Sequence, residues 1–224
     1  MKKIVTILGA RPQFVKAAVL SRIIKKHNNI EEIIVHTGQH FDSNMSAIFF
    51  DEMMIPKPKY NLEINSMSHG AMTGLMLLEI EKVLIEEVPD AVVVYGDTNS
   101  TIAGALAAKK MHIKVVHIEA GLRSFNMKMP EEINRILTDR ISDLLSCPTE
   151  IATDNLKKEG FDNLPILIEK HGDIMKDAVG YYSQFSEKKS SIISEEKLQK
   201  NKFVLATIHR QENTDDEEKL RSIF

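Results

Sequence analysis

One short segment, Ala91–Tyr95, constrains the fold of this chain more than any other. All five residues are apolar, and three of them are valine, which favours β-strands. A strand without alternating polar residues is buried on both faces, as in parallel sheets covered by helices. Residues 72–88 before it have apolar side chains at helical spacing, and a second helical pattern follows Gly96. The segment therefore predicts a buried strand between two helices.

The same alternation recurs along the first 145 residues. Further strands are expected at 4–8, 33–36 and 115–118. Further helices are expected after the turn at 9–12, over 41–50, and over 130–145. Strands that alternate with helices in this way predict an α/β fold with a doubly wound, Rossmann-like parallel sheet and right-handed crossovers.

The charge and cysteine content exclude several classes of protein. The net charge is -3, whereas a nucleic-acid partner would favour a basic face. No apolar run approaches the roughly 20 residues that span a bilayer, so no membrane association is expected. The single cysteine, Cys147, excludes an internal disulfide and a cysteine-rich zinc site. We expect a cytoplasmic protein.

A polar stretch over 183–202 predicts a domain boundary. Residues 203–208 after it are expected to form a new strand, followed by a loop and the opening of a helix. One strand and one helix cannot bury their own faces, so this unit either extends the first sheet or begins a second domain. We expect a Rossmann-like domain over 1–182 and, over 183–224, a connection with the first strand–helix unit of a truncated carboxy-terminal domain.

Four polar clusters follow predicted strands, where ligands bind to open parallel sheets. The first contains Arg11 and Lys16 at a helix amino terminus, a place that favours anions. The second contains Asp97, which serves equally well as a helix cap or as a catalytic acid. The third contains Glu119 and Arg123, which could also be a structural ion pair, and the fourth contains the pair His209 and Arg210.

Acidic residues also follow Pro130, at the start of a predicted helix. Glu131 and Glu132 suit the helix dipole there, so a purely structural role is a fair alternative. The chain has no HExxH motif, no cysteine pair and no GxSxG motif, which argues against a metal site and a serine nucleophile. Carboxylates, a histidine and cations at strand ends instead favour acid–base chemistry on a phosphate-bearing substrate.

At these residues the chain resembles the non-hydrolysing UDP-N-acetylglucosamine 2-epimerase family. The similarity extends through seven motifs in order: Gly9-Ala10-Arg11-Pro12, Thr37-Gly38-Gln39-His40, Gly96-Asp97-Thr98, His117-Ile118-Glu119-Ala120-Gly121-Leu122-Arg123, Pro130-Glu131-Glu132-Ile133-Asn134-Arg135, Cys147-Pro148-Thr149-Glu150 and His209-Arg210-Gln211-Glu212-Asn213. The forms around Phe14 and Phe125 look especially like the branch that acts on UDP-2,3-diacetamido-2,3-dideoxyglucuronate.

The resemblance implies a GT-B-like architecture, with the active site between two Rossmann-like domains and most uridine and pyrophosphate contacts in the second. It implies inversion at C2 of a UDP-sugar without cofactor or metal, in a full-length homodimer that serves polysaccharide biosynthesis. Some members also bind a second, activating UDP-sugar near Gln39 and His40, but the basic residue expected near Gly74 is missing.

The roles implied by the resemblance fall into two groups. The expected catalytic residues are Asp97, Glu119, Glu131 and His209. The expected substrate-binding residues are Arg11, Lys16, His40, Arg123, Glu132, Arg135 and Arg210. The competing interpretations are the diacetamido-glucuronate epimerase, a GT-B glycosyltransferase, and a fragment that binds a ligand without turnover.

Overall fold

The computed structural model describes residues 1–39, 50, 52–199, 201–208 and 211–224. The expected helix over 41–50 lies almost entirely outside the described residues. The chain divides into two compact units, Met1–Tyr181 and Tyr182–Phe224, which we describe separately.

The first unit is built around a seven-stranded sheet in which all neighbouring strands are parallel, with the order β3-β2-β1-β4-β5-β6-β7. The strands are β1 (Lys2–Leu8), β2 (Ile30–His36), β3 (Tyr60–Asn61), β4 (Ala91–Tyr95), β5 (Lys114–Ile118), β6 (Leu144–Cys147) and β7 (Leu167–Lys170). The order reverses between β1 and β4, which is the topological switch point of a doubly wound fold. The predicted fold class is confirmed.

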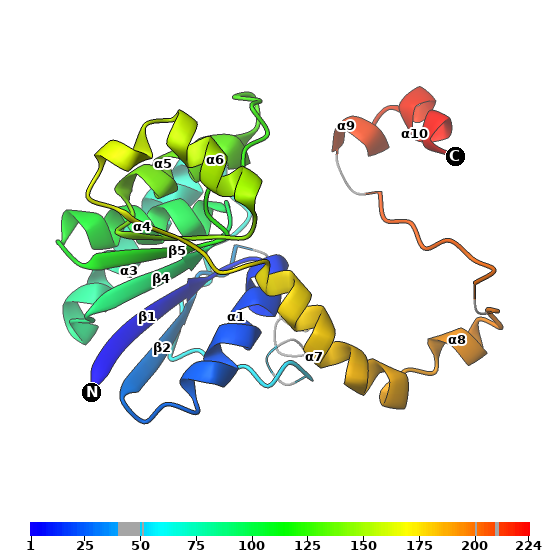
Figure 1. Cartoon of the computed structure of the whole chain (residues 1–224), viewed down its shortest axis with the longest axis horizontal. Helices are drawn as coiled ribbons and strands as arrows, with labels where there is room; N and C mark the ends of the chain where they lie inside the picture. The colour runs from blue at the N-terminus through cyan, green and yellow to red at the C-terminus, as the bar shows by residue number, and fades with distance from the viewer. Residues whose placement is uncertain (40–49, 51, 200, 209–210) are drawn as a thin grey trace. The chain divides into compact units, whose positions relative to one another are not determined.

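Helices cover both faces of this sheet (Figure 1). They are α1 (Arg11–Ile24), α3 (His69–Glu87), α4 (Asn99–Lys110), α5 (Pro130–Ile141), α6 (Glu150–Lys158), the 3₁₀ turn η1 (Phe161–Asn163) and the first part of α7 (Ile174–Lys189). α3 and α4 pack on the face opposite α1, where Met76 and Ile80 meet Val92 and Val94 in the main hydrophobic core. Arg22 of α1 stacks 3.4 Å from the ring centroid of Tyr181 in α7.

The carboxylate of Glu87 anchors the edge strand β3 to α3. Its oxygens accept hydrogen bonds from Lys59 Nζ (2.5 Å), the Tyr60 hydroxyl (2.6 Å) and Lys3 Nζ (3.2 Å). Hydrogen bonds from Lys59 and Tyr60 lower the pKa of Glu87 to about 2. These side-chain contacts add to the backbone hydrogen bonds that Lys59 and Leu62 donate to the carbonyls of Ile34 and His36 in β2.

Two sequence-based expectations need correction. The helix expected over 130–145 ends at Ile141, because Ser142 is extended and residues 144–147 pair with β5 as strand β6. Residues 203–208 form no strand, because the described part of the chain offers them no pairing partner, and the side chains of Val204 and Leu205 are exposed.

The second unit contains the end of α7, α8 (Ile192–Glu195), α9 (Gln211–Thr214) and α10 (Glu217–Ile223). The Asp216 carboxylate caps α10 by accepting from the Lys219 N–H over 3.1 Å. No helix in the described residues of either unit has the length and apolar character needed to cross a membrane.

Candidate functional site

The carboxyl ends of β1 and β4 are joined by one side chain, that of Gln13 in the first turn of α1. Its Nε2 donates to the Tyr95 carbonyl over 2.8 Å, while its Oε1 accepts from the Gly9 and Ala10 N–H groups at 2.8 and 3.0 Å. A glutamine at the third helical position that reaches back to the N-cap is half of a capping box. The same side chain therefore fixes the loops on both sides of the switch point.

Gly9 allows three segments of the chain to approach one another at the carboxyl end of β1. A Cβ at Gly9 would lie 2.1 Å from Ser100 Oγ and 2.2 Å from Thr37 Oγ1, so only glycine fits. Ser100 Oγ lies 2.8 Å from Thr37 Oγ1 and 2.7 Å from Gln39 Oε1. The loops after β1 and β2 and the start of α4 are thus held together by small polar groups.

The turn after β4 contacts an ion pair between Lys16 of α1 and Glu119, which follows β5. Gly96 has a φ of 62°, and a Cβ there would lie 3.1 Å from Glu119 Oε2 and 3.3 Å from Lys16 Nζ. The side chains of Lys16 and Glu119 are 9% and 21% exposed, so the pair is largely buried at the edge of the sheet and Glu119 keeps some contact with solvent. Residues of the first three predicted clusters therefore meet at this turn.

Asp97 and Glu132 share one cation, Arg135 of α5. Arg135 Nη2 pairs with the Asp97 carboxylate, and its Nη1 lies 2.8 Å from Glu132 Oε2. Glu132 is buried and also accepts from the backbone N–H groups of Ser124 (2.9 Å) and Phe125 (2.8 Å). Burial by itself raises the pKa of Glu132, but the hydrogen bonds from Ser124, Arg135 and Phe125 lower it on balance. These contacts favour a structural role for Glu132.

Arg123 is enclosed by protein groups. Its Nε and Nη2 bind the Glu159 carboxylate at 2.7 and 2.8 Å, and its Nη1 binds Asp139 Oδ2 and the Leu122 carbonyl, both at 2.7 Å. The Arg123 side chain is 1% exposed. Four of its five donors are occupied, which favours a structural role for Arg123 over contact with substrate. Its partners are Asp139 and Glu159, whereas Glu119, the partner expected from the sequence, pairs with Lys16.

The other predicted site residues are exposed or lie outside the described residues. Arg11 is the exposed first residue of α1, and Glu131 is exposed in the first turn of α5. Within the described residues, the Glu131 carboxylate has no hydrogen bond or ion pair to another side chain. His40, His209 and Arg210 lie outside the residues that the structure describes.

A cavity of about 130 Å³ opens beside Glu119 at the ends of β5 and β6. Ser146 and Asp173 line it together with apolar side chains such as those of Leu20 and Ile174. Ser146 Oγ lies 3.0 Å from His171 Nδ1. The cavity places a small, mostly apolar space within reach of the Lys16–Glu119 pair.

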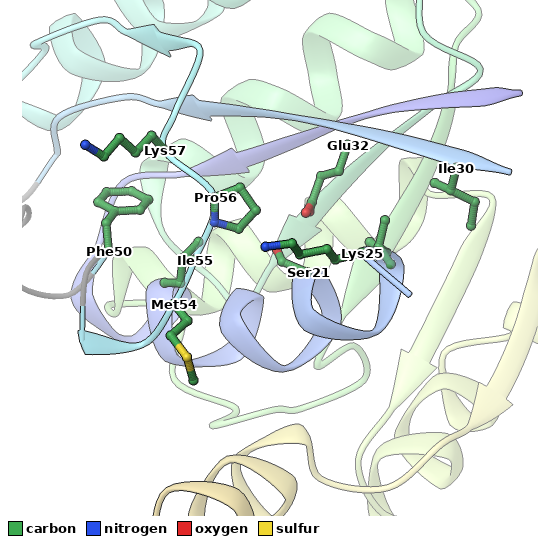
Figure 2. Close-up of a pocket in the computed structure, with 10 residues that line it drawn as sticks. Ser21, Lys25, Ile30, Glu32, Phe50, Met54, Ile55, Pro56 and Lys57 are labelled. Carbon is green, nitrogen blue, oxygen red and sulfur yellow. The ribbon is translucent and has the colours of Figure 1, made fainter. Parts of the chain in front are cut away.

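A second cavity, of about 480 Å³, lies at the other end of the sheet. Figure 2 shows Glu32 of β2 in this cavity, with Ser21 of α1 and Lys25, which directly follows that helix, beside it. Burial raises the pKa of Glu32, and the hydrogen bond from Thr6 lowers it in part. The lining of the cavity extends from Ile30 and Glu32 in the amino-terminal half of β2 to Phe50, whose ring lies 6.1 Å from that of His36 at the end of the strand, and it includes neither Asp97 nor Glu119.

Metal and thiol chemistry find no support in the described residues. They contain no group of three or more histidine, cysteine, aspartate or glutamate side chains that could hold a metal ion. Burial raises the pKa of the Cys147 thiol to about 12, so this thiol is a poor nucleophile.

Comparison with known proteins assigns the chain to a family. A family model described as UDP-N-acetylglucosamine 2-epimerase matches residues 22–224. The chain belongs to the UDP-N-acetylglucosamine 2-epimerase family. The resemblance drawn from the seven motifs is thereby confirmed.

Curated members of the UDP-N-acetylglucosamine 2-epimerase family align with nearly the whole chain. A UDP-2,3-diacetamido-2,3-dideoxy-D-glucuronate 2-epimerase of Pseudomonas aeruginosa is 57% identical over 221 residues, which are 99% of this chain and 61% of that protein. A UDP-N-acetylglucosamine 2-epimerase of Methanocaldococcus jannaschii is 48% identical and is covered to 60%. The chain therefore spans about 60% of the length of these relatives.

Solved structures of the UDP-N-acetylglucosamine 2-epimerase family share the fold. The M. jannaschii enzyme, crystallised in complex with UDP-GlcNAc and UDP, matches with a TM-score of 0.89 and 48% identity, over 100% of this chain and 60% of that chain. The Neisseria meningitidis enzyme bound to UDP-GlcNAc matches with a TM-score of 0.76 and 31% identity, over 91% of this chain and 54% of that chain.

Proposed function

We propose that this chain is the part of a non-hydrolysing UDP-sugar 2-epimerase that acts on C2 of the sugar. The observation that carries the proposal is the meeting of Asp97, Glu119 and Lys16 around the Gly96 turn, at the switch point where such folds bind ligands. Family membership supports the reaction type.

The proposed reaction proceeds through elimination and re-addition of UDP. A carboxylate removes the C2 proton, and the electrons of the C2–H bond form a C1=C2 double bond while the C1–O bond breaks and UDP leaves with its electron pair. A second acid then protonates C2 from the opposite face, and a UDP oxygen re-adds at C1. Cations near the pyrophosphate stabilise the negative charge that develops on the leaving group.

The geometry suggests different roles for the carboxylates. Asp97 and Glu119 are each held by a cation and so have fixed positions, which suits residues that must meet one carbon atom. Glu131 is exposed on the first turn of α5 and is free to contact the sugar. We assign proton transfer and sugar positioning to these three, without allotting the faces of C2.

Cationic residues of the first loop are assigned to the phosphates. Arg11 lies at the amino terminus of α1, where the helix dipole also favours an anion. Lys16 lies five residues further along the same helix and contacts Glu119. His209, Arg210 and His40 remain expected contacts of the leaving phosphate and substrate, on the resemblance alone.

The identity of the sugar has two candidates. UDP-N-acetylglucosamine is favoured by the family and by the M. jannaschii enzyme, whereas UDP-2,3-diacetamido-2,3-dideoxyglucuronate is favoured by the P. aeruginosa relative at 57% identity. Both are 2-acetamido sugars attached to UDP, so the proposed chemistry at C2 is common to them.

The remaining expectations concern the whole protein. We propose that residues 183–224 connect to a second, UDP-binding Rossmann-like domain, and that the full-length protein is a cytoplasmic homodimer. The first 182 residues would supply the carboxylates and the second domain most contacts to uridine.

Proton NMR in deuterated water tests this proposal. The chain alone, and the chain joined to the carboxy-terminal part of its 57% identical relative from Methanococcus maripaludis, are incubated with each UDP-sugar. We expect deuterium at C2 and accumulation of the C2 epimer with the joined form. Deuterium exchange by the joined form, but not by the chain alone, would show that a second domain is needed. Transfer of the sugar to an acceptor without deuterium exchange at C2 would favour a glycosyltransferase. Binding of the UDP-sugar without any reaction would favour an inactive fragment.

A further inference from the structure

The turn that carries Asp97 is held by side chains from outside it. Three consecutive carbonyl groups each accept a hydrogen bond from a different element: Tyr95 from Gln13 Nε2 of α1 (2.8 Å), Gly96 from His117 Nε2 of β5 (2.7 Å) and Asp97 from Asn134 Nδ2 of α5 (2.8 Å). The Gly96 N–H also donates to the Ile118 carbonyl over 3.0 Å. The middle residue of this turn is a glycine, which has wide backbone freedom, so its conformation depends on these outside contacts.

The contact to Gly96 is controlled by a fully buried carboxylate. Asp139 Oδ1 lies 2.7 Å from His117 Nδ1, and both side chains are 0% exposed. Asp139 Oδ2 accepts from the Gly121 N–H over 3.1 Å and from Arg123 over 2.7 Å. Asp139 thus links the turn after β4 to the loop after β5, and these two segments carry Asp97 and Glu119.

We propose that Asp139 is a positioning residue that acts through His117 on the Gly96 carbonyl and thereby holds the Asp97 carboxylate in its working position. This inference rests on the proposed function. Neither side chain faces solvent, so neither meets substrate, and their effect reaches the reaction through the backbone of the turn.

The hydrogen bonds fix how the imidazole is oriented. A carbonyl oxygen can only accept, so His117 Nε2 carries the hydrogen that binds Gly96. Asp139 holds the other ring nitrogen, and one proton lies between Nδ1 and Oδ1. An imidazole held at both nitrogens cannot turn, so the Gly96 carbonyl has a donor at a constant place.

A purely structural ion pair is the competing interpretation. It would stabilise the domain without any special effect on turnover. The two interpretations differ in the Asp139→Asn variant. With its oxygen facing Gly121 and Arg123, the new amide can donate to His117 Nδ1, which leaves Nε2–H bound to Gly96. Asp139→Ala removes the contact at Nδ1, so that only the hydrogen bond to Gly96 restrains the ring.

The first measurement is ¹⁵N NMR of the histidine rings in this chain, with His117 assigned from the His117→Gln variant. We expect a protonated Nε2 whose hydrogen exchanges slowly with water, in the wild type and in Asp139→Asn. An unprotonated Nε2 in the wild type would overturn the proposed contact.

The second measurement is steady-state epimerisation by the joined form described above. Asp139→Ala should lower kcat about 10²-fold, the cost of a displacement near 1 Å, and leave KM within about threefold. Asp139→Asn should keep most of the wild-type kcat, because its amide can still hold His117. His117→Leu, which breaks the same contact, is the second test if Asp139→Ala does not fold. Leu156→Ala is the stability control, because Leu156 is equally buried in the core under β6 and should retain kcat.

The outcomes separate the two proposals. A kcat for Asp139→Ala or His117→Leu equal to that of Leu156→Ala would reduce the network to a structural ion pair. Absence of C2 exchange by the wild-type joined form with both UDP-sugars would instead reject the proposed function. The ¹⁵N NMR of the His117 ring would still decide whether Nε2 donates a hydrogen bond to the Gly96 carbonyl.

Discussion

The amide of Gln13 donates to the carbonyl of Tyr95 over 2.8 Å, although 82 residues separate them in the sequence. This bond crosses the switch point of the sheet and is fully buried. We expect Gln13→Glu to lower the free energy of unfolding by about 1–3 kcal/mol, because a buried carboxylate cannot donate to the Tyr95 carbonyl, which then keeps only its hydrogen bond from the Thr101 hydroxyl. Chemical denaturation measures this. Gln199→Glu on the exposed surface should change stability by less than about 0.5 kcal/mol, and equal effects would contradict the prediction.

The Gly9→Ala variant tests the close approach of the loops behind the site. The added methyl would meet Ser100 Oγ and Thr37 Oγ1 at 2.1 and 2.2 Å, so the loops must separate. We expect a loss of about 1–3 kcal/mol in the free energy of unfolding. Gly74→Ala is the matched control, since nothing lies within 4 Å of its new methyl, and it should gain up to about 1 kcal/mol in helix α3. Similar losses in both variants would show that the packing at Gly9 is unimportant.

The pKa of Glu87 predicts how stability depends on acid. Because its folded pKa of about 2 is below the ordinary value of 4.5, its contribution is fully present above that ordinary value and is lost as the pH falls towards 2. We expect Glu87→Gln to be less stable than the wild type at pH 7 and to lose less stability between pH 4.5 and 2. Glu81→Gln, at an exposed position of the same helix, should follow the wild-type curve. Thermal unfolding across this pH range makes the comparison.

Asp97→Asn should remove most turnover of the joined form and leave the fold intact. The amide has the shape of the carboxylate but cannot take up a proton, and loss of an acid–base group costs about 10²- to 10⁴-fold in rate. Rates of C2 deuterium exchange, with circular dichroism as the check on folding, test this. Asp154→Asn on the exposed face of α6 is the control. Near-normal exchange by Asp97→Asn would remove Asp97 from the mechanism.

Arg11→Ala should chiefly weaken the binding of the UDP-sugar. A charge-assisted hydrogen bond contributes about 1.5–3 kcal/mol, so the dissociation constant should rise roughly 10- to 100-fold. Isothermal titration calorimetry of the joined form measures this directly. Lys26→Ala removes an exposed cation just beyond the other end of α1 and should leave the affinity unchanged. An unaltered affinity in Arg11→Ala would make Arg11 a solvated residue of the turn.

Much of the fold could be predicted because its strands are buried on both faces. Ala91–Tyr95 was predicted to the residue, since an unbroken apolar run between a proline and a glycine has few other interpretations. The boundary near Ile141 was missed because residues 144–147 continue an apolar pattern that suits a helix or a strand. Only the pairing with β5 decides between them.

In the candidate site too, some residues could be predicted from the sequence and others only from the tertiary structure. Lys16, Asp97 and Glu119 could be predicted to lie near one another, because the carboxyl ends of parallel strands share one edge of the sheet. Asp139 could not be found in this way, since an acidic residue beside Arg140 in a helix looks like an ordinary solvent-exposed group. Its role depends on complete burial against His117, which only the tertiary structure reveals.

The three outside donors to residues 95–97 separate the shape of this turn from its chemistry. Side chains of Gln13, His117 and Asn134 bind the backbone of the turn, whereas the side chain of Asp97 points to a separate partner, Arg135. A different side chain at position 97 would therefore leave these three hydrogen bonds in place, whereas a change in any one of the three donors would alter the position of whatever group the turn presents.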